Sequence, residues 1–255
     1  MIRAKLWSLY EGLAMGLGLG FLGLLCLGWL PAALLLSLLP PAPQRQRRAR
    51  TVIGAAFRLY LRFLTATCAT RIDLTALRAL QDASPRVLIA NHPSLIDVIL
   101  IVSQLPNTVC IMKASLRHNP LLGPAARLAG YIRNDGPLEL VLKARTALAE
   151  GAHVLIFPEG GRTRNFPLDP FGPAAALIAQ RAGVPLQPCV IWLDPPYLGK
   201  RWPLWRKPSL PWQGRVEPLD ALPPPTDLRA ASQRLEAQLR AALDTQFPPL
   251  QYPSP

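Results

Sequence analysis

The stretch RVLIANHPSLID, residues 86–97, decides the fold of this chain. Its apolar run, 86–90, shows no polar alternation, which indicates a short strand buried on both faces. The run stops at Asn91-His92-Pro93, and Pro93 suits the first turn of a helix, where no backbone N–H is needed. We therefore expect a strand at 86–90 and a helix that begins at Pro93.

His92 is one of only three histidines in the chain, and Asp97 follows it by five positions. Helical side chains lean back toward the N-terminus, so Asp97 is expected to reach one imidazole nitrogen. That bond would fix the tautomer and leave the other nitrogen as a general base. A histidine and an aspartate at this spacing are more often structural. Here, however, Ser94 is best explained as a helix-start residue, and no other serine or cysteine is placed to complete a triad. The pattern favours a base that activates a hydroxyl group of the substrate.

A second candidate motif, FPEGGRTRN at 157–165, also follows an apolar run. Glycine lets the backbone approach a ligand closely. Arg162 and Arg164 can grip a phosphate through their planar guanidinium groups. The alternative is an exposed turn with solvated arginines, but the apolar run before it favours a site.

The rest of the chain alternates between apolar runs and helical periodicity. Further strands are expected at 108–113, 153–160 and 184–192, and helices at 137–150, 173–183 and 226–245. This alternation predicts an α/β fold, a mixed sheet flanked by helices. Ligands of such folds gather beyond the carboxyl ends of the strands, where His92 and the Pro158-Glu159-Gly160 turn are expected to meet.

The N-terminal segment 13–39 contains no charged residue. As one helix it would measure about 40 Å, which exceeds the ~30 Å hydrocarbon core of a bilayer. Pro31 would kink or break such a helix, so we expect two shorter apolar helices that form a membrane hairpin. Basic residues flank the run on both sides, which suits a hairpin that enters and leaves through one face. A single tilted span is the alternative. A secretory signal would need a shorter apolar core and a clear cleavage site.

Charge points to an anionic partner. The chain carries 28 Lys+Arg against 15 Asp+Glu, a formal net charge of +13. Residues 51–66 are apolar with Arg58 and Arg62 on one helical face, which suits a helix in the headgroup region, with an ordinary core helix as the alternative. The segment KRWPLWRK at 200–207 interleaves basic and indole side chains. Beside a membrane anchor, this pattern favours the bilayer surface over nucleic acid.

The domain organisation follows from these segments. We expect a membrane-anchoring apolar segment at 1–50, an α/β domain at 51–245 and a loose Pro-rich tail at 246–255. The four cysteines are scattered without a CxxC pair. This spacing argues against a disulfide framework or a zinc site and favours a reducing compartment.

These motifs carry a resemblance to a known family. NHPSLID at 91–97 and FPEGGRTR at 157–164 match the NHxxxxD and FPEGTRS motifs of the glycerolipid acyltransferases. The chain resembles the membrane-bound 1-acylglycerol-3-phosphate (lysophosphatidate) acyltransferases over about residues 50–195, and two weaker blocks, 113–134 and 184–190, also fit.

The resemblance implies a fold, a reaction and roles for residues. His92 would be the catalytic base and Asp97 its orienting partner. Pro185 would belong to a block that binds the acyl chain or the donor. The group that binds the phosphate-bearing acceptor would comprise Glu159, Gly160, Arg162 and Arg133, with Lys113 as a further contributor.

The implied reaction moves an acyl group from a thioester of coenzyme A or acyl carrier protein to the free hydroxyl of a lyso-phospholipid such as lysophosphatidate. The family uses no metal and no other cofactor. The implied partners are the lipid bilayer, the lyso-lipid and an acyl donor, with no nucleic acid. The implied location is the cytoplasmic face of the inner membrane.

Three positions depart from the family pattern. Gly161 replaces the usual threonine, Ile132 replaces a frequent acidic residue, and the segment PLDPFGP lacks a usual basic residue. These departures keep open an acceptor of another kind, such as an aminolipid or a specialised lipid. A catalytically silent lipid-binding homologue is a further alternative. A nucleic-acid-binding protein is suggested by the charge alone, without a matching motif.

Overall fold

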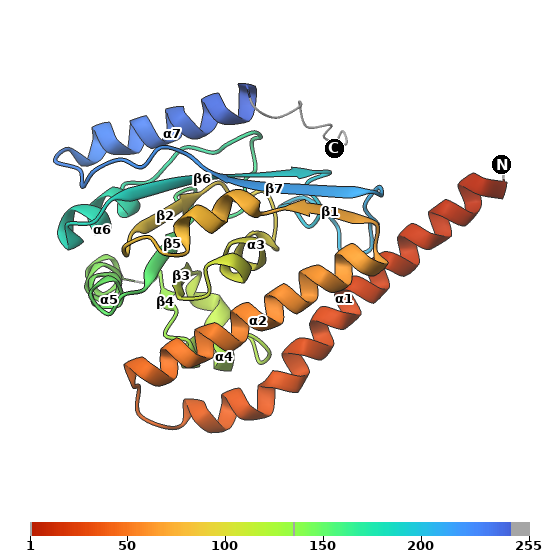
Figure 1. Cartoon of the computed structure of the whole chain (residues 1–255), viewed down its shortest axis with the longest axis horizontal. Coiled ribbons are helices and arrows are strands. Elements are labelled where there is room, and N and C mark those ends of the chain that lie inside the picture. The colour runs from red at the N-terminus through yellow and green to blue at the C-terminus, as the bar shows by residue number, and fades with distance from the viewer. Residues whose placement is uncertain (1, 135, 246–255) are drawn as a thin grey trace.

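The structure, a computed structural model that describes residues 2–134 and 136–245, places a seven-stranded mixed sheet at the centre of the molecule (Figure 1). The strand order is β1-β7-β6-β2-β5-β3-β4, and β6 with β7 is the antiparallel pair of this sheet. The strands are β1 (Thr70–Asp73), β2 (Val87–Ala90), β3 (Thr108–Met112), β4 (Ile132–Arg133), β5 (His153–Ile156), β6 (Leu186–Asp194) and β7 (Trp212–Pro218).

Helices cover both faces of the sheet (Figure 1). One face packs against α2 and α3, with α1 outside them, and the other packs against α5, α6 and α7. The helices are α1 (Ile2–Ser37), α2 (Pro43–Thr67), α3 (Asp97–Gln104), α4 (Gly123–Leu128), α5 (Pro137–Ala149), α6 (Ala174–Ala182) and α7 (Leu228–Thr245), with 3₁₀ turns η1 (Thr75–Leu80) and η2 (Ala114–His118).

Strand β2 explains why its sequence is continuously apolar. Leu88 and Ala90 point into the core beneath α2 and α3, whereas Val87 and Ile89 point into the core beneath α5 and α6. All four are fully buried, as a parallel strand covered on both faces requires. The expected α/β class, a mixed sheet flanked by helices, is confirmed, and the apolar N-terminus is helical.

The helix after β2 begins later than the sequence predicted. It begins at Asp97 rather than at Pro93. The intervening residues form a tight turn, because the Asp97 carboxylate accepts the backbone N–H of Ser94 at 2.8 Å. This turn brings Asp97 to the beginning of α3 instead of one turn inside it.

The expected break at Pro31 is wrong, because α1 is one helix that includes this proline. The residues around Pro31 are held by packing, with Trp29 and the fully buried Ala33 against Ala49 of α2. A proline costs a helix one hydrogen bond, which such contacts offset. A helical hairpin does form, but it consists of α1 and α2, and the chain reverses at 38–42 (Figure 1).

Helix α2 is longer than the predicted helix 51–66 and runs through position 50, the expected end of the anchor. Its buried face packs closely against α3. A Cβ on Gly54 would lie 2.6 Å from Cβ of Pro106, so the packing there requires glycine. Arg58 donates to the carbonyl of Ser103 at 2.9 Å, whereas Arg62 is exposed. One face of α2 therefore packs on the protein core. That its other face lies among lipid headgroups stays a prediction.

Strands β1, β4 and β7 were not predicted. Strand β7 nevertheless alternates, with Trp212, Gly214 and Val216 buried and the residues between them exposed. The proline-rich segment before β7 made the alternation of buried and exposed residues hard to recognise in the sequence. The predicted tail, 246–255, lies outside the described residues.

His153, the first residue of β5, makes folding stability depend on pH. Its ring is buried, and its Nδ1 has no hydrogen-bond partner among the described residues. Burial, with the charge of Arg86 adding to it, lowers the pKa of His153 from 6.5 to about 4. The unfolded chain takes up this proton near pH 6.5, so stability is lost as pH falls from 6.5 toward 4.

We predict that His153→Phe removes this pH dependence while keeping the ring volume. Between pH 7 and pH 4.5 the parent protein should lose up to about 3 kcal/mol more unfolding free energy than the variant. Urea unfolding in detergent at a series of pH values measures the difference. Parallel curves for the two proteins would contradict the assignment.

Candidate active site

The sheet brings four predicted site residues to one edge. Strands β2, β5, β3 and β4 run parallel, so their carboxyl ends lie on the same side. His92 follows β2, Glu159 follows β5, Lys113 follows β3, and Arg133 ends β4. This is the edge at which open α/β sheets bind ligands.

Asn91 fixes the end of β2 to its neighbour β6. Its side-chain Nδ2 donates to the carbonyl of Ile191 at 2.8 Å, and its Oδ1 accepts the N–H of Ile191 at 2.7 Å. The side-chain amide of Asn91 thus extends the hydrogen bonding between β2 and β6 beyond the last backbone pair. The backbone that carries the next residue, His92, is held as firmly as the sheet itself.

His92 and Asp97 form the predicted pair. The distance from Nδ1 of His92 to Oδ2 of Asp97 is 2.7 Å. The imidazole also stacks on Phe157, with ring centroids 4.0 Å apart and planes 16° apart. Asp97 is fully buried, whereas the His92 side chain is 17% exposed. With Nδ1 bonded to Asp97 and one face covered by Phe157, the ring has a fixed orientation and solvent access at its rim.

Glu159 ties the β5–α6 loop to the backbone of His92. Its Oε1 accepts the N–H of His92 at 2.7 Å and the hydroxyl of Thr163 at 3.0 Å, and its Oε2 accepts the N–H of Asp169 at 3.0 Å. The N–H of Thr163 in turn donates to the carbonyl of His92 at 2.8 Å. The carboxylate predicted to meet the substrate is thus occupied by contacts that hold the histidine.

Both carboxylates depend on their donors for their charge. Burial raises the pKa of Asp97, and hydrogen bonds from His92 and Ser94 oppose that rise. Burial also raises the pKa of Glu159, and the donors Asp169, Thr163 and His92 oppose it. Loss of these donors would therefore favour the protonated carboxyl groups.

A loop after β6, residues 195–199 (PPYLG), crosses over the histidine turn, and we call it the strap. The hydroxyl of Ser94 donates to the carbonyl of Tyr197. Nη1 of Arg162 donates to the carbonyls of Leu198 at 2.8 Å and Gly199 at 3.1 Å. A Cβ on Gly199 would lie 2.9 Å from the carbonyl oxygen of Pro196 and 3.1 Å from that of Pro93, so a side chain here would crowd both the strap and the histidine turn. Arg162 is therefore a contact of the strap as well as a candidate phosphate ligand.

The remaining predicted residues lie at different distances from this centre. Gly160 closes the turn after β5 with a φ of +71°, a left-handed conformation that favours glycine. Lys113 is exposed, and Arg133 is partly buried. Pro185 lies at the opposite, amino edge of the sheet, where its carbonyl accepts the N–H of Val87. The structure therefore gives Pro185 no direct contact with a substrate at His92.

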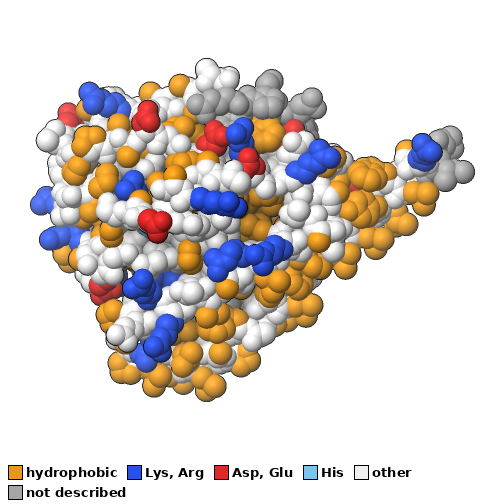
Figure 2. All heavy atoms as spheres, in the orientation of Figure 1, with side chains coloured by type: hydrophobic (Ala, Val, Ile, Leu, Met, Phe, Trp, Pro, Cys, Tyr) orange, Lys and Arg blue, Asp and Glu red, His pale blue; other side chains and the backbone are white. Residues whose placement is uncertain are grey.

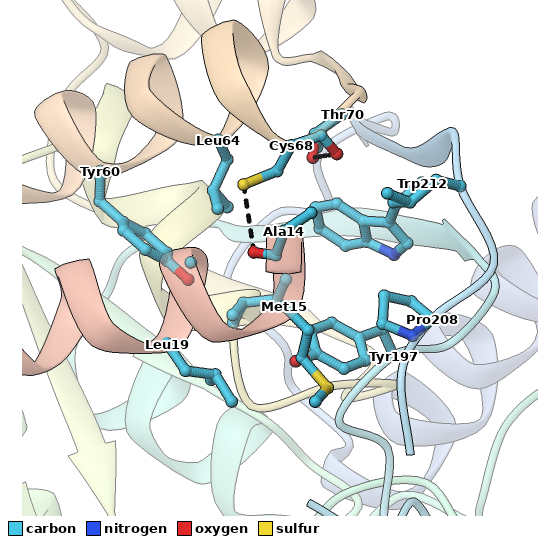
Figure 3. Close-up of a pocket in the computed structure, with 13 residues that line it drawn as sticks. Ala14, Met15, Leu19, Tyr60, Leu64, Cys68, Thr70, Tyr197, Pro208 and Trp212 are labelled. Atoms are coloured by element: carbon cyan, nitrogen blue, oxygen red, sulfur yellow. Dashed lines mark hydrogen bonds between the residues drawn. The ribbon is translucent and has the colours of Figure 1, made fainter. Parts of the chain in front are cut away.

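An apolar cavity lies on the α1 side of the histidine turn (Figure 3). Ala14 and Leu19 of α1, Tyr60 and Leu64 of α2, and Tyr197 of the strap line it. Its volume of about 30 Å³ holds about one water molecule and is too small for an acyl chain. An acyl chain could enter here only if α1 or the strap moved.

The comparisons with known proteins agree with the motifs. A family model described as Acyltransferase matches residues 71–192. A 1-acyl-sn-glycerol-3-phosphate acyltransferase of Cocos nucifera is 34% identical over 139 residues, covering 52% of this chain and 42% of that protein. The human 1-acyl-sn-glycerol-3-phosphate acyltransferase beta is 32% identical over 133 residues, covering 47% and 46%. Over about half of its length, the chain is therefore similar to proteins named as 1-acyl-sn-glycerol-3-phosphate acyltransferases.

The chain also has the fold of a solved structure. The crystal structure of the 1-acyl-sn-glycerophosphate (LPA) acyltransferase PlsC from Thermotoga maritima superposes with a TM-score of 0.66 at 18% identity. The match covers 95% of this chain and 97% of that one. By sequence, the chain spans about half the length of the curated relatives that it matches.

Several residues that position the candidate site were not predicted. They are Phe157, Thr163, Asp169 and the strap. Thr163 is fully buried although it lies in an exposed, arginine-rich turn. The contacts of Phe157 and Thr163 with His92, and of the strap with Ser94 and Arg162, join segments that are distant in the chain, so no local pattern marks them. Within the described residues, no three His, Cys, Asp or Glu side chains cluster as a metal site requires.

We predict that Glu159→Gln destabilises the protein by about 1–3 kcal/mol, because the amide NH₂ would face a backbone or hydroxyl donor in place of an acceptor. Chemical unfolding in detergent measures the loss. Glu150→Gln, at an exposed glutamate on the C-terminal end of α5, is the matched control and should be neutral. Equal stability of the two variants would contradict the role assigned to Glu159.

Proposed function

We propose that this chain is a membrane-associated O-acyltransferase. It would move an acyl group from a thioester of coenzyme A or acyl carrier protein to the free hydroxyl of a lyso-phospholipid such as lysophosphatidate. The observation that carries the proposal is the 2.7 Å contact between His92 Nδ1 and the buried Asp97 at the carboxyl edge of the sheet. The names of the relatives support the substrate class.

The chemistry follows from this pair. Nδ1–H of His92 donates a hydrogen bond to Asp97, so in the neutral ring the proton stays on Nδ1 and Nε2 is unprotonated. Nε2 removes the proton of the acceptor hydroxyl while its oxygen attacks the thioester carbonyl. The carbon–sulfur bond then breaks, and the thiolate takes the proton back from the imidazolium. The products are an ester and a free thiol, and the histidine returns to its starting state without an acyl-enzyme intermediate.

Two sets of residues support this step. Asn91, Glu159 and Thr163 position the backbone of His92 through the contacts described above. Arg162, Arg133 and Lys113 supply positive charge along the same edge for the acceptor phosphate. The guanidinium of Arg162 has five N–H groups, so its two bonds to the strap leave donors for a phosphate. Gly160 and Gly161 leave open space above the turn.

The N-terminal hairpin supports a seat on the membrane. Among the described helices, α1 alone is long and apolar enough to cross a bilayer. It nevertheless packs against the rest of the chain at two distant points, Ala14 and Ala33, which favours a hairpin seated on one face over a perpendicular span. The lyso-lipid could then keep its chain in the bilayer while its hydroxyl reaches His92.

One specific observation favours a different acceptor. Gly161 lacks the hydroxyl of the threonine in the FPEGTRS motif that this segment resembles, and Arg162 is partly engaged by the strap. Both features weaken a phosphate site. A second candidate function is therefore acyl transfer to an aminolipid or another specialised lipid, with the same base. A panel of lyso-lipids with and without a terminal phosphate distinguishes the two.

We predict that the purified chain releases free thiol from acyl-coenzyme A or acyl carrier protein when a lyso-lipid is present. His92→Ala and Asp97→Asn should each lower the rate by about 10²–10⁴-fold, because the first removes the base and the second its orienting carboxylate. His153→Phe, far from the site at the amino edge, is the histidine control and should keep its activity. Full activity of His92→Ala would contradict the mechanism. Lipid binding without turnover for every donor and acceptor would favour a silent homologue.

A further inference from the structure

The segment 200–207 (KRWPLWRK), which we call the tip loop, lies between β6 and β7, directly after the strap. Its most prominent feature is a pair of exposed apolar side chains. Leu204 is 63% exposed and Trp205 84%, the largest value among the exposed large hydrophobic residues of the described chain. Single exposed apolar residues are common on protein surfaces, whereas a contiguous apolar patch marks an interaction site, so the neighbours of this pair decide its meaning.

The tip loop has a defined conformation. The N–H of Arg206 donates to the carbonyl of Pro203 at 3.0 Å, so Leu204 and Trp205 occupy the two central positions of a turn. The indole of Trp202 donates to the carbonyl of Arg206 at 2.7 Å, and the Arg206 guanidinium lies 5.0 Å from the Trp202 ring centroid. These contacts hold Trp202 inward and present Trp205 outward.

The tip loop is also fixed to α1. Nζ of Lys207 lies 2.9 Å from Oε2 of Glu11 and donates to the carbonyl of Ser8 at 2.7 Å. The N–H of Leu210 donates to Oε1 of the same glutamate at 3.3 Å. Glu11 is the only acidic residue among the first 72 of the sequence, so its position on an apolar helix is explained by this attachment.

The attachment makes two apolar surfaces neighbours. The part of α1 that receives Lys207 exposes Leu6, Leu9 and Leu13, each by more than half. Figure 2 shows hydrophobic side chains along this projecting N-terminal arm. Four cations, Lys200, Arg201, Arg206 and Lys207, surround the tip, and no acidic residue occurs between Asp194 and Glu217. Indole, leucine and lysine or arginine together are the composition of a bilayer interface.

We propose that the tip loop is a second membrane-contacting element, separate from the α1–α2 hairpin, and that Trp205 and Leu204 insert among the headgroups of an anionic bilayer. The cations around the tip bind lipid phosphates, and the Lys207–Glu11 contact keeps the tip level with the leucines of α1. Basic and aromatic residues also bind single-stranded nucleic acid. The adjoining row of exposed leucines favours lipid, because leucine side chains form no hydrogen bonds or charge contacts with a nucleic acid.

The placement has a consequence for the active site, and this part rests on the proposed function. The tip loop continues into the strap, whose carbonyls accept hydrogen bonds from Ser94 and Arg162. A tip seated in the headgroups would hold the strap, and with it the histidine turn, at a fixed height above the lipid surface. His92 would then lie at the same depth in the bilayer as the hydroxyl group of the lyso-lipid.

Fluorescence of Trp205 tests the proposal directly. The full chain is reconstituted into vesicles of phosphatidylcholine with phosphatidylglycerol, and the spectrum of Trp205→Phe is subtracted from that of the parent. We expect the difference spectrum to shift to the blue and to be quenched by lipids brominated near the carbonyl group. Trp202→Phe, whose indole is held inward, gives the matched control spectrum and should lack this quenching. Quenching of Trp205 by aqueous iodide instead, or a shift on adding single-stranded DNA rather than vesicles, would overturn the proposal.

A second measurement separates this proposal from the proposed function. The double variant Leu204→Ser/Trp205→Ser should keep its rate on a lyso-lipid dispersed in detergent and lose rate on the same lipid in vesicles. Equal rates of variant and parent in vesicles would overturn the positioning role. If no form of the protein turns over, the acyltransferase proposal fails, while the fluorescence result still decides whether the tip inserts.

Discussion

A single hydrogen bond between a buried carboxylate and an imidazole determines what this site can do. Asp97 is held without solvent at the beginning of α3, and its Oδ2 accepts bonds from both the His92 ring and the Ser94 backbone. Burial disfavours the charge of Asp97, so the charge depends on these donors. The same bonds that orient the histidine therefore favour the charged form of its partner, and the two residues form one unit.

The other contacts at the carboxyl edge of the sheet hold the His92–Asp97 pair in place. Asn91 joins the end of β2 to β6, and Glu159 with Thr163 joins the β5–α6 loop to the backbone of His92. The strap closes the other side through Ser94 and Arg162. Because the strap continues into a loop fixed to Glu11 of α1, the apolar N-terminus and the histidine turn belong to one connected structure.

The sequence predicted the parts that are locally encoded. Strand β2 is uniformly apolar because both faces are covered, and the residues after it carry the motif, so the class of fold and the His92–Asp97 contact could be predicted. The single helix through Pro31 could not, because distant packing against α2 offsets a local penalty. The inward role of Glu159 was also hidden, since the N–H of His92 that it binds lies 67 residues away in the chain. Pro185 shows the limit of inference from motif blocks, because its block lies at the opposite edge.

The tautomer of His92 tests the account most directly. The chain has three histidines, so nitrogen-15 labelling of their rings gives few signals, and His92→Ala assigns the one that matters. The account predicts a neutral His92 ring with its proton on Nδ1 and a bare Nε2, and a loss of that preference in Asp97→Asn. A proton found on Nε2 in the neutral parent protein, or an unchanged tautomer in Asp97→Asn, would contradict it.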